Sequence, residues 1–158
     1  MIRITRQVDY GILLLVRFAA GGGQESLTAR DLARETGLPL PMVSKILKTL
    51  AREGLLVSQR GVKGGYRMLR RSHRISIAEV IRALDGPIAI TQCIDEREGD
   101  CALERLCPVS WRWQTINGAI QEALRGITLA DMCRAPGPAR RRPGSIALEP
   151  TGALGAPS

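Results

Sequence analysis

Apolar positions recur at helical spacing through the first half of the chain and predict three helices. The first covers residues 5–20, begins at Thr5, ends at a triple glycine, and has its stripe at Val8, Ile12, Leu15, Val16 and Ala19. The second starts at Thr28, which with Asp31 resembles a capping box, and stops at Gly37. The third runs from Pro41 to Gly54 on Met42, Val43, Ile46, Leu47 and Leu50. The last two form a helix-turn-helix pattern.

Two strand-like runs follow, residues 55–57 and 66–69, on either side of a glycine-rich stretch over residues 59–65. Glycine tolerates positive φ, so the stretch predicts a hairpin tip from which Arg60 and Lys63 project. A basic hairpin beside a helix-turn-helix is a wing. Ser76 to Glu79 then form a second capping box, which predicts a helix that ends at Asp85 and Gly86.

A longer helix is predicted from Pro108, with its apolar stripe at Val109, Trp113, Ile116, Ile120 and Leu124. The chain offers this stripe no large partner further on, so we expect a dimerisation helix over residues 108–133. Packing on the first helix of the same chain is the alternative. From residue 134 onward five prolines and three consecutive arginines predict a disordered tail over residues 134–158.

The expected fold class is therefore mainly α with a small β-hairpin. A winged helix-turn-helix over residues 1–86 is followed by a cysteine-containing loop over residues 87–107 and by the long helix. The core is expected to be aliphatic, because the chain has only one Phe, two Tyr and two Trp.

Charge separates the two halves of the chain. Residues 1–85 carry fifteen Lys and Arg against seven Asp and Glu, whereas residues 86–133 carry four against seven. A basic front half is typical of a protein that binds a polyanion, although it also serves as a solubilising surface. The apolar run over residues 11–16 is far too short for a membrane span and no targeting signal is visible, so we expect a cytoplasmic protein with no membrane partner.

Three cysteines, Cys93, Cys101 and Cys107, lie within one short acidic segment. Thiolates suit zinc or an iron–sulfur cluster, but structural zinc sites favour closer pairs, and the single histidine, His73, lies far upstream. The acidic neighbours also oppose the lowered thiol pKa that a reactive cysteine switch needs. A cluster is therefore favoured over zinc or a thiol switch. Cys133 stands apart and is interpreted as a spare thiol.

Several short motifs together resemble a known family. The pair Asp9-Tyr10, the wing sequence over residues 60–66 and the three cysteines are similar to the winged-helix regulators that include the iron–sulfur sensor IscR and the nitric-oxide sensor NsrR. Within that family the chain looks most like the regulators of the SUF iron–sulfur assembly operon, through residues 79–81, 85–89, 113–114 and 127–131. The resemblance covers about residues 1–132.

The resemblance implies a homodimer that binds partly palindromic double-stranded DNA operators. Each recognition helix would enter a major groove, and each wing would reach the flanking minor groove or backbone. The positions expected to contact DNA are Thr28, Pro41, Met42, Ser44, Lys45, Lys48, Arg60, Lys63, Gly64 and Tyr66. For Lys45 and Lys48 the alternative is a solvated helix face, and for Tyr66 it is packing beneath the hairpin.

The resemblance also bears on the cluster ligands. IscR-like members have a histidine three positions after the third cysteine, where this chain has Ser110. NsrR-like members use an aspartate from the first helix of the partner subunit, and Asp9 occupies the matching position. The expected metal ligands are therefore Cys93, Cys101, Cys107 and Asp9, with a 2Fe–2S cluster favoured over a 4Fe–4S cluster. The alternative for Asp9 is a charge that complements the helix dipole.

The expected function is a transcriptional regulator, as a repressor of SUF genes, gated by cluster occupancy. The alternatives are a nitric-oxide or redox-sensing regulator of the same fold and an iron–sulfur carrier. A carrier has no use for a wing and a recognition helix. The sequence has no phosphate-binding loop and no Ser/His/Asp set, so an enzyme is not expected.

Overall fold

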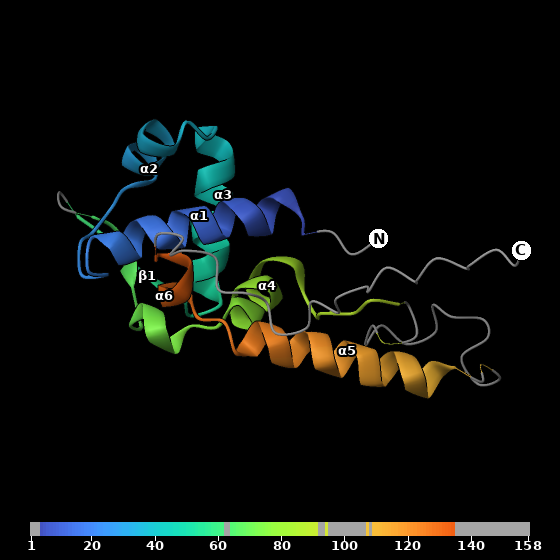
Figure 1. The fold of residues 1–158 in the computed structure, drawn as a ribbon. Coiled ribbons are helices and arrows are strands. Elements are labelled where there is room, and N and C mark those ends of the chain that lie inside the picture. Colours follow the sequence, from blue (N-terminus) through green and yellow to red (C-terminus); the bar gives the residue numbers. More distant parts are fainter. Residues whose placement is uncertain (1–3, 62–63, 92–93, 95–106, 108, 135–158) are drawn as a thin grey trace, which may run out of the picture.

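The computed structural model describes residues 4–61, 64–91, 94, 107 and 109–134. Their elements are α1 (Arg6–Ala20), α2 (Ala29–Thr36), α3 (Leu40–Arg52), β1 (Leu56–Gln59), β2 (Gly65–Met68), the 3₁₀ helix η1 (Ser72–Arg74), α4 (Ile77–Asp85), α5 (Ser110–Arg125) and α6 (Leu129–Met132). Figure 1 shows α1 through the middle of the molecule, with α2 on one side, α4 and α5 on the other, and α3 crossing α1. The expected mainly α fold with a small hairpin is confirmed.

Helices α1, α2 and α4 begin where their capping residues predicted, whereas α5 begins at Ser110, two residues after the predicted start at Pro108. Thr5 caps α1 by accepting a hydrogen bond from the backbone N–H of Val8 at 3.4 Å. Ser76 and Glu79 form a complete capping box at the start of α4. The C-cap of α2 is Gly37, which has a φ of 71° and so adopts the left-handed conformation that favours glycine. Helix α3 ends at Arg52, two residues before the predicted stop at Gly54.

The buried face of α1 differs from the predicted stripe. Val8 and Leu15 are buried as expected, but Ile12, Val16 and Ala19 are only partly buried. The remaining buried positions are Gly11, Leu14 and Phe18. Because α3, α4, α6 and the hairpin all contact α1, its buried surface is wider than one helical stripe.

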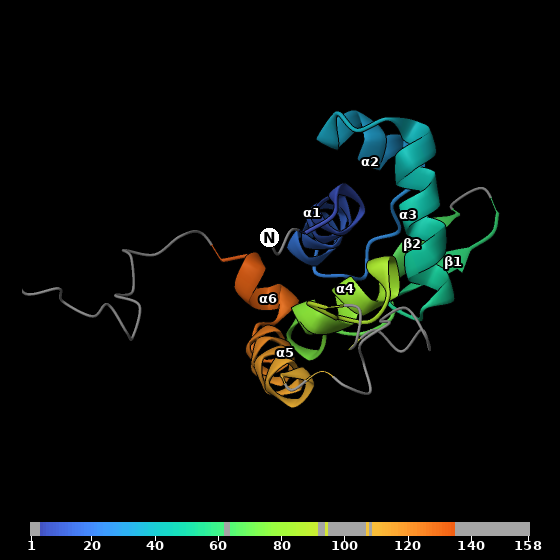
Figure 2. The ribbon, with the colours of Figure 1, turned by 90° about the vertical axis from the view of Figure 1, so that its right-hand side faces the viewer.

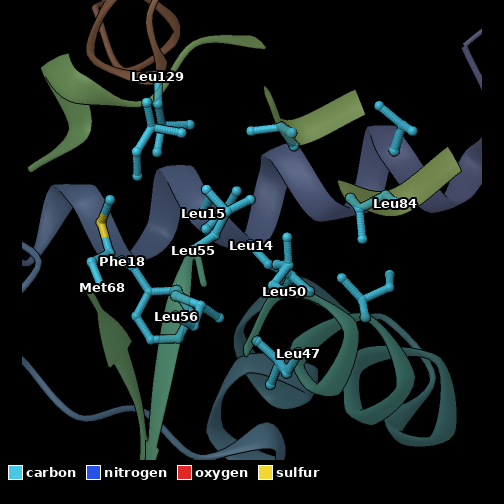
Figure 3. Close-up of a cluster of buried hydrophobic side chains, with 14 of the residues drawn as sticks. Leu14, Leu15, Phe18, Leu47, Leu50, Leu55, Leu56, Met68, Leu84 and Leu129 are labelled. Atoms are coloured by element: carbon cyan, nitrogen blue, oxygen red, sulfur yellow. The ribbon is translucent and has the colours of Figure 1, made fainter. Parts of the chain in front are cut away.

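The hydrophobic core lies around α1, where elements distant in sequence meet (Figure 3). It is mainly aliphatic, as expected. Leu14, Leu15 and Phe18 of α1 face side chains from α3, the hairpin, α4 and α6. The labelled partners are Leu47, Leu50, Leu55, Leu56, Met68, Leu84 and Leu129. The core thus fixes α3 and the base of the hairpin relative to each other.

The chain returns to this core after α5. The backbone N–H of Leu129 donates to Ile75 O at 2.8 Å, and that of Ile77 donates to Ile127 O at 2.9 Å. Leu129 is fully buried, and α6 packs against α1 and η1. Helix α5 itself packs against α4, as both views show (Figures 1 and 2). Among the described helices none is long and apolar enough to cross a membrane.

Candidate nucleic-acid interface and cysteine segment

Helix α3 presents one apolar and one basic face. Its inner face is buried in the core at Val43, Ile46, Leu47 and Leu50. The opposite face is exposed, and its positions one turn apart are Pro41, Lys45, Lys48 and Arg52. The predicted contacts Lys45 and Lys48 therefore point to solvent from the second helix of the helix-turn-helix. Arg52 extends this face by one turn, as its helical spacing from Lys48 indicates, and it pairs with Glu53 Oε1 at 3.1 Å.

The first turn of α3 is unusual because its exposed side chains are apolar. Leu40 is 39% exposed and Met42 is 37% exposed. Pro39 occupies the N-cap without a side-chain hydrogen bond. A shallow groove of about 410 Å³ opens here between the starts of α1 and α3; its lining residues are Gln7, Pro39, Pro41, Met42, Lys45 and Ile46. Ser44, on the other side of the turn, is half-buried.

The wing is an antiparallel hairpin in which Leu56 pairs with Met68 and Gln59 with Gly65. Leu27 adds a short third edge, since its backbone exchanges two hydrogen bonds of 2.9 Å with Tyr66. The Tyr66 side chain is half-buried and packs against the core. That is the packing alternative considered for this residue, and it ties the hairpin to the segment before α2.

Arg60 lies exposed at the described edge of the wing tip, and Lys63 lies outside the described residues. The tip turns sharply beside it. Gly61 has a φ of 110°, and a Cβ on Gly64 would lie 2.7 Å from Gln59 O. Gly64 therefore has a steric reason to be glycine, because any side chain would push the two strands apart.

Thr28 serves as the N-cap of α2. Its hydroxyl donates to Asp31 Oδ2 at 2.6 Å and accepts from the Asp31 backbone N–H at 3.2 Å. The side-chain hydrogen bond from Thr28 is the main reason that the pKa of the Asp31 carboxyl is lowered. The hydroxyl of Thr28 is thus already engaged within α2.

Of the three cysteines predicted to bind the cluster, the structure describes Cys107. Cys93 and Cys101 lie outside the described residues. Cys107 is a half-buried free thiol just before α5, and its carbonyl accepts a hydrogen bond from the Ser110 N–H at 3.4 Å. Within the described part of the chain, no three His, Cys, Asp or Glu side chains gather as a metal site requires.

Asp9 is exposed in the first turn of α1, and no ion-pair partner for it is found among the described residues. The same turn is tied to the end of α4, because Gln7 Nε2 donates to Leu84 O at 2.9 Å. The chain leaves α4 at this point and enters the segment that carries the cysteines. The turn that bears Asp9 and the entry to the cysteine segment are therefore neighbours.

Two amides on α5 fix that entry from the other side, a feature missed from the sequence. Asn117 Nδ2 donates to Ile88 O at 2.9 Å, and Gln121 Nε2 donates to the same oxygen at 3.1 Å. Asn117 is 3% exposed, an uncommon burial for a polar residue on a helix. In the sequence this feature is visible as two amide side chains, Asn117 and Gln121, one helical turn apart.

Cys133 follows α6. Its thiol donates to Leu129 O at 3.2 Å, and partial burial of the sulfur raises its pKa. A raised pKa makes the thiolate of Cys133 less available at neutral pH. His73, in η1, is exposed.

Comparison with known proteins agrees with this architecture. The Rrf2 family model, described as an iron-dependent transcriptional regulator, matches residues 4–135. An HTH-type transcriptional regulator named rrf2-like from Rhodobacter capsulatus is 30% identical over 145 residues, which cover 87% of this chain and 97% of that protein. The regulator IscR of Vibrio cholerae is 29% identical over 130 residues, covering 82% of this chain and 74% of IscR.

Solved structures show the same fold. The global cysteine regulator CymR of B. subtilis superposes with a TM-score of 0.65 at 26% identity, covering 84% of this chain and 97% of CymR. IscR of T. potens gives a TM-score of 0.61 at 26% identity, covering 83% of this chain and 85% of IscR. These proteins are transcriptional regulators and not enzymes. The chain therefore belongs to the Rrf2 family of winged-helix, DNA-binding transcriptional regulators.

Proposed function

We propose that this regulator is a cytoplasmic homodimer that represses SUF iron–sulfur assembly genes and is gated by an iron–sulfur cluster. The observation that carries the proposal is the position of Cys107. In chain order it follows Ile88, whose carbonyl is held by Asn117 and Gln121, and it directly precedes α5. A group bound to this segment would therefore lie in the connection between the winged helix-turn-helix and the long helix.

The DNA-reading surface comprises the exposed face of α3 and the wing. Lys45 and Lys48 project from α3, and Arg60 projects from the hairpin. In helix-turn-helix proteins the second helix enters the major groove, and a basic side chain on a flap suits the narrow minor groove. Lys45 and Lys48 would then contact phosphates or guanines, with Arg60 inserted beside them.

A second copy of the chain would cover the apolar residues of α5. Trp113 is 39% exposed and Ile116 is 45% exposed, and Trp111 and Val109 are exposed near them. Large apolar side chains in a row on a free helix commonly pack against another protein surface. If two α5 helices pair about a two-fold axis, the dimer has two recognition helices, and each can bind one half-site of the operator.

The donor set fits an iron–sulfur cluster. Cys93, Cys101 and Cys107 supply three soft thiolates, and the exposed carboxylate of Asp9 from the partner subunit would supply the fourth ligand. When bound, the cluster supplies a ligated centre that oxidants or nitric oxide can remove. Loss of the cluster would be transmitted to α5 through the Ile88 carbonyl, because Asn117 of α5 donates a hydrogen bond to that oxygen at the entry to the cysteine segment. Relatives named IscR support this assignment.

The test combines anaerobic purification with DNA binding. We expect iron and sulfide in the purified protein, their loss in Cys107→Ser, and operator affinity that differs between the holo and apo forms. Cys133→Ser is the matched control and should keep the cluster. Asp9→Ala should change the visible absorption of the holo protein. Equal operator affinity with and without the cluster would rule out gating, and an unchanged spectrum would remove Asp9 from the site.

Phosphate contacts are tested separately through salt. Neutralising phosphates with Lys and Arg releases counterions, so the affinity should fall steeply between about 50 and 200 mM salt. Lys48→Ala should reduce the slope of log affinity against log salt by about one. An affinity that is flat across this range would argue against the binding surface.

A nitric-oxide sensor of the same fold is the second candidate. It is favoured by Ser110 in place of the histidine and by the exposed Asp9. Adding nitric oxide to the holo protein under anaerobic conditions distinguishes the two. Operator release by nitric oxide, with no response to iron limitation, would favour this second candidate.

A further inference from the structure

The start of α3 determines what kind of base edge this protein can read. In a helix-turn-helix the N-terminal residues of the second helix contact base edges. Here the first three residues of α3 are Leu40, Pro41 and Met42, all exposed; none has a side-chain donor, and the thioether of Met42 is only a weak acceptor. The first basic side chain, Lys45, comes one turn later.

The surface beside this turn is apolar as well. Pro39, Pro41, Met42 and Ile46 line most of the groove between α3 and α1. The side-chain N–H₂ of Gln7, at its edge, already donates to Leu84 O. The groove therefore offers a DNA base mainly carbon atoms, with the ammonium of Lys45 at one side.

Only one group on a major-groove edge suits such a surface. Guanine, adenine and cytosine present donors and acceptors there, whereas thymine also presents its C5-methyl group. A polar base edge that loses water against an apolar groove without a new hydrogen bond is disfavoured. A methyl group in the same place is favoured by burial.

We propose that Met42 and Pro41 read a thymine methyl group in each half-site of the operator. This inference rests on the proposed role of α3 as the recognition helix. Met42 and Pro41 supply selectivity for thymine at one position. Lys45, exposed and without an ion pair among the described residues, supplies affinity through phosphate or guanine.

The experiment starts from a duplex selected in vitro for binding to the full-length protein. Each thymine is then replaced singly by deoxyuridine, which removes only the methyl group. We expect one position per half-site at which this replacement weakens binding by about fourfold, the value of one buried methyl group. In Met42→Ala the thymine duplex should bind more weakly, and deoxyuridine at that position should cause no further loss.

Three variants define the interpretation. Met42→Leu keeps an apolar side chain and should retain the preference for thymine over deoxyuridine. Lys45→Ala should weaken binding to both duplexes equally. Met132→Ala removes an exposed methionine from α6 and should change neither affinity. Urea unfolding of Met42→Ala, expected to match the unmodified protein, excludes misfolding as the cause.

The inference is overturned if deoxyuridine is tolerated at every position, or if Met42→Ala keeps the full preference for thymine. Either result leaves the proposed DNA-reading role of α3 intact, provided that Lys45→Ala still weakens binding. If substitutions in α3 have no effect on a tightly bound duplex, the proposed recognition helix is wrong and the thymine reading falls with it.

Discussion

Gly11 allows α1 and α4 to pack in direct contact. It is buried in the middle of a helix, a position where glycine costs about 1 kcal/mol relative to alanine. A Cβ atom there would overlap Cδ1 of Leu84 and come within 3.7 Å of Ile46. The structure therefore accepts a poor helix former because close packing against Leu84 requires it.

This packing predicts a specific non-additivity. Gly11→Val should lower the free energy of unfolding by about 2 kcal/mol, because the added methyl groups overpack the contact with Leu84. Leu84→Ala alone should also destabilise, by leaving a cavity. The double substitution should cost less than the sum of the two, since the valine fills part of that cavity. Urea unfolding measures all three, and additive costs would show that the two residues do not meet.

At the scale of elements, short polar motifs fix where helices begin and how they are joined. Glu79 closes the capping box of α4, accepting from the Ser76 backbone N–H at 2.8 Å, and pairs with Arg70 at 2.9 Å. Partial burial alone would raise the pKa of the Glu79 carboxyl. The hydrogen bond from Ser76 and the pair with Arg70 outweigh burial, so its pKa lies below the usual range.

A lowered pKa makes the contribution of Glu79 depend on pH. The stabilisation is present above the range where carboxyl groups normally titrate, about pH 4, and is lost as the pH falls through the lower folded-state pKa. Glu79→Gln should therefore destabilise by about 1 kcal/mol near neutral pH, as loss of a cap does, and by less at about pH 3. Urea unfolding at both values measures the difference.

The matched control is Glu122→Gln, which removes an exposed pair with Arg125 on α5. Exposed pairs contribute little, so stability should stay nearly constant at both pH values. If Glu79→Gln were equally destabilising at low and neutral pH, the carboxylate would not be the stabilising group.

The clamp on Ile88 is the second element-scale device. Two amides donate to one carbonyl, so removing either Asn117 or Gln121 leaves that oxygen with a donor. Each alanine variant should cost about 1 kcal/mol, and the double variant should cost more than the sum, because only then is the carbonyl unsatisfied. Chemical unfolding of the three variants provides the measurement. Simple additivity would mean that water replaces the amides.

At the scale of the whole molecule, the described part of the chain closes around α1 while the apolar row of α5 stays exposed. The bridge between residues 75–77 and 127–129 and the burial of Leu129 return the segment after α5 to α1. Helix α5 is held at α4 and yet keeps Trp113 and Ile116 exposed. The proposed homodimer accounts for this combination.

The dimer predicts a clear change in mass. Ile116→Glu places a charge in the exposed row of α5 and should convert the protein from dimer to monomer in light scattering coupled to gel filtration. Operator affinity should fall with it, because two half-sites are no longer bound together. Gln114→Glu, on an exposed position of the same helix, is the control and should remain dimeric. A monomeric unmodified protein would contradict the proposal.

Local signals explain how much of the fold the sequence predicted. Thr5, Thr28, Ser76 and Thr128 cap helices through atoms three residues away, so their pattern is visible in any short window. The wing was predicted for the same reason, since its glycines relieve clashes within one turn. The basic face of α3 also followed from helical spacing.

Contacts between distant segments were not visible in this way. The buried face of α1 was placed on too narrow a stripe because α3, α4 and α6 surround it only in the folded chain. The Ile88 clamp joins positions about thirty residues apart, and its two amides carry no pattern that names their partner. The apolar groove at Met42 likewise needs both α1 and α3.

By itself the sequence determined the capped helix starts, the wing and the winged helix-turn-helix class, because hydrogen bonds and steric limits between near neighbours specify them. It also supplied the three cysteines on which the proposed cluster rests. Only the tertiary structure decided which face of α1 is buried, that α6 completes the core, and that Asn117 and Gln121 hold the Ile88 carbonyl. Those features depend on which surfaces, distant in sequence, bury each other from water in the folded chain, and the order of residues does not show this directly.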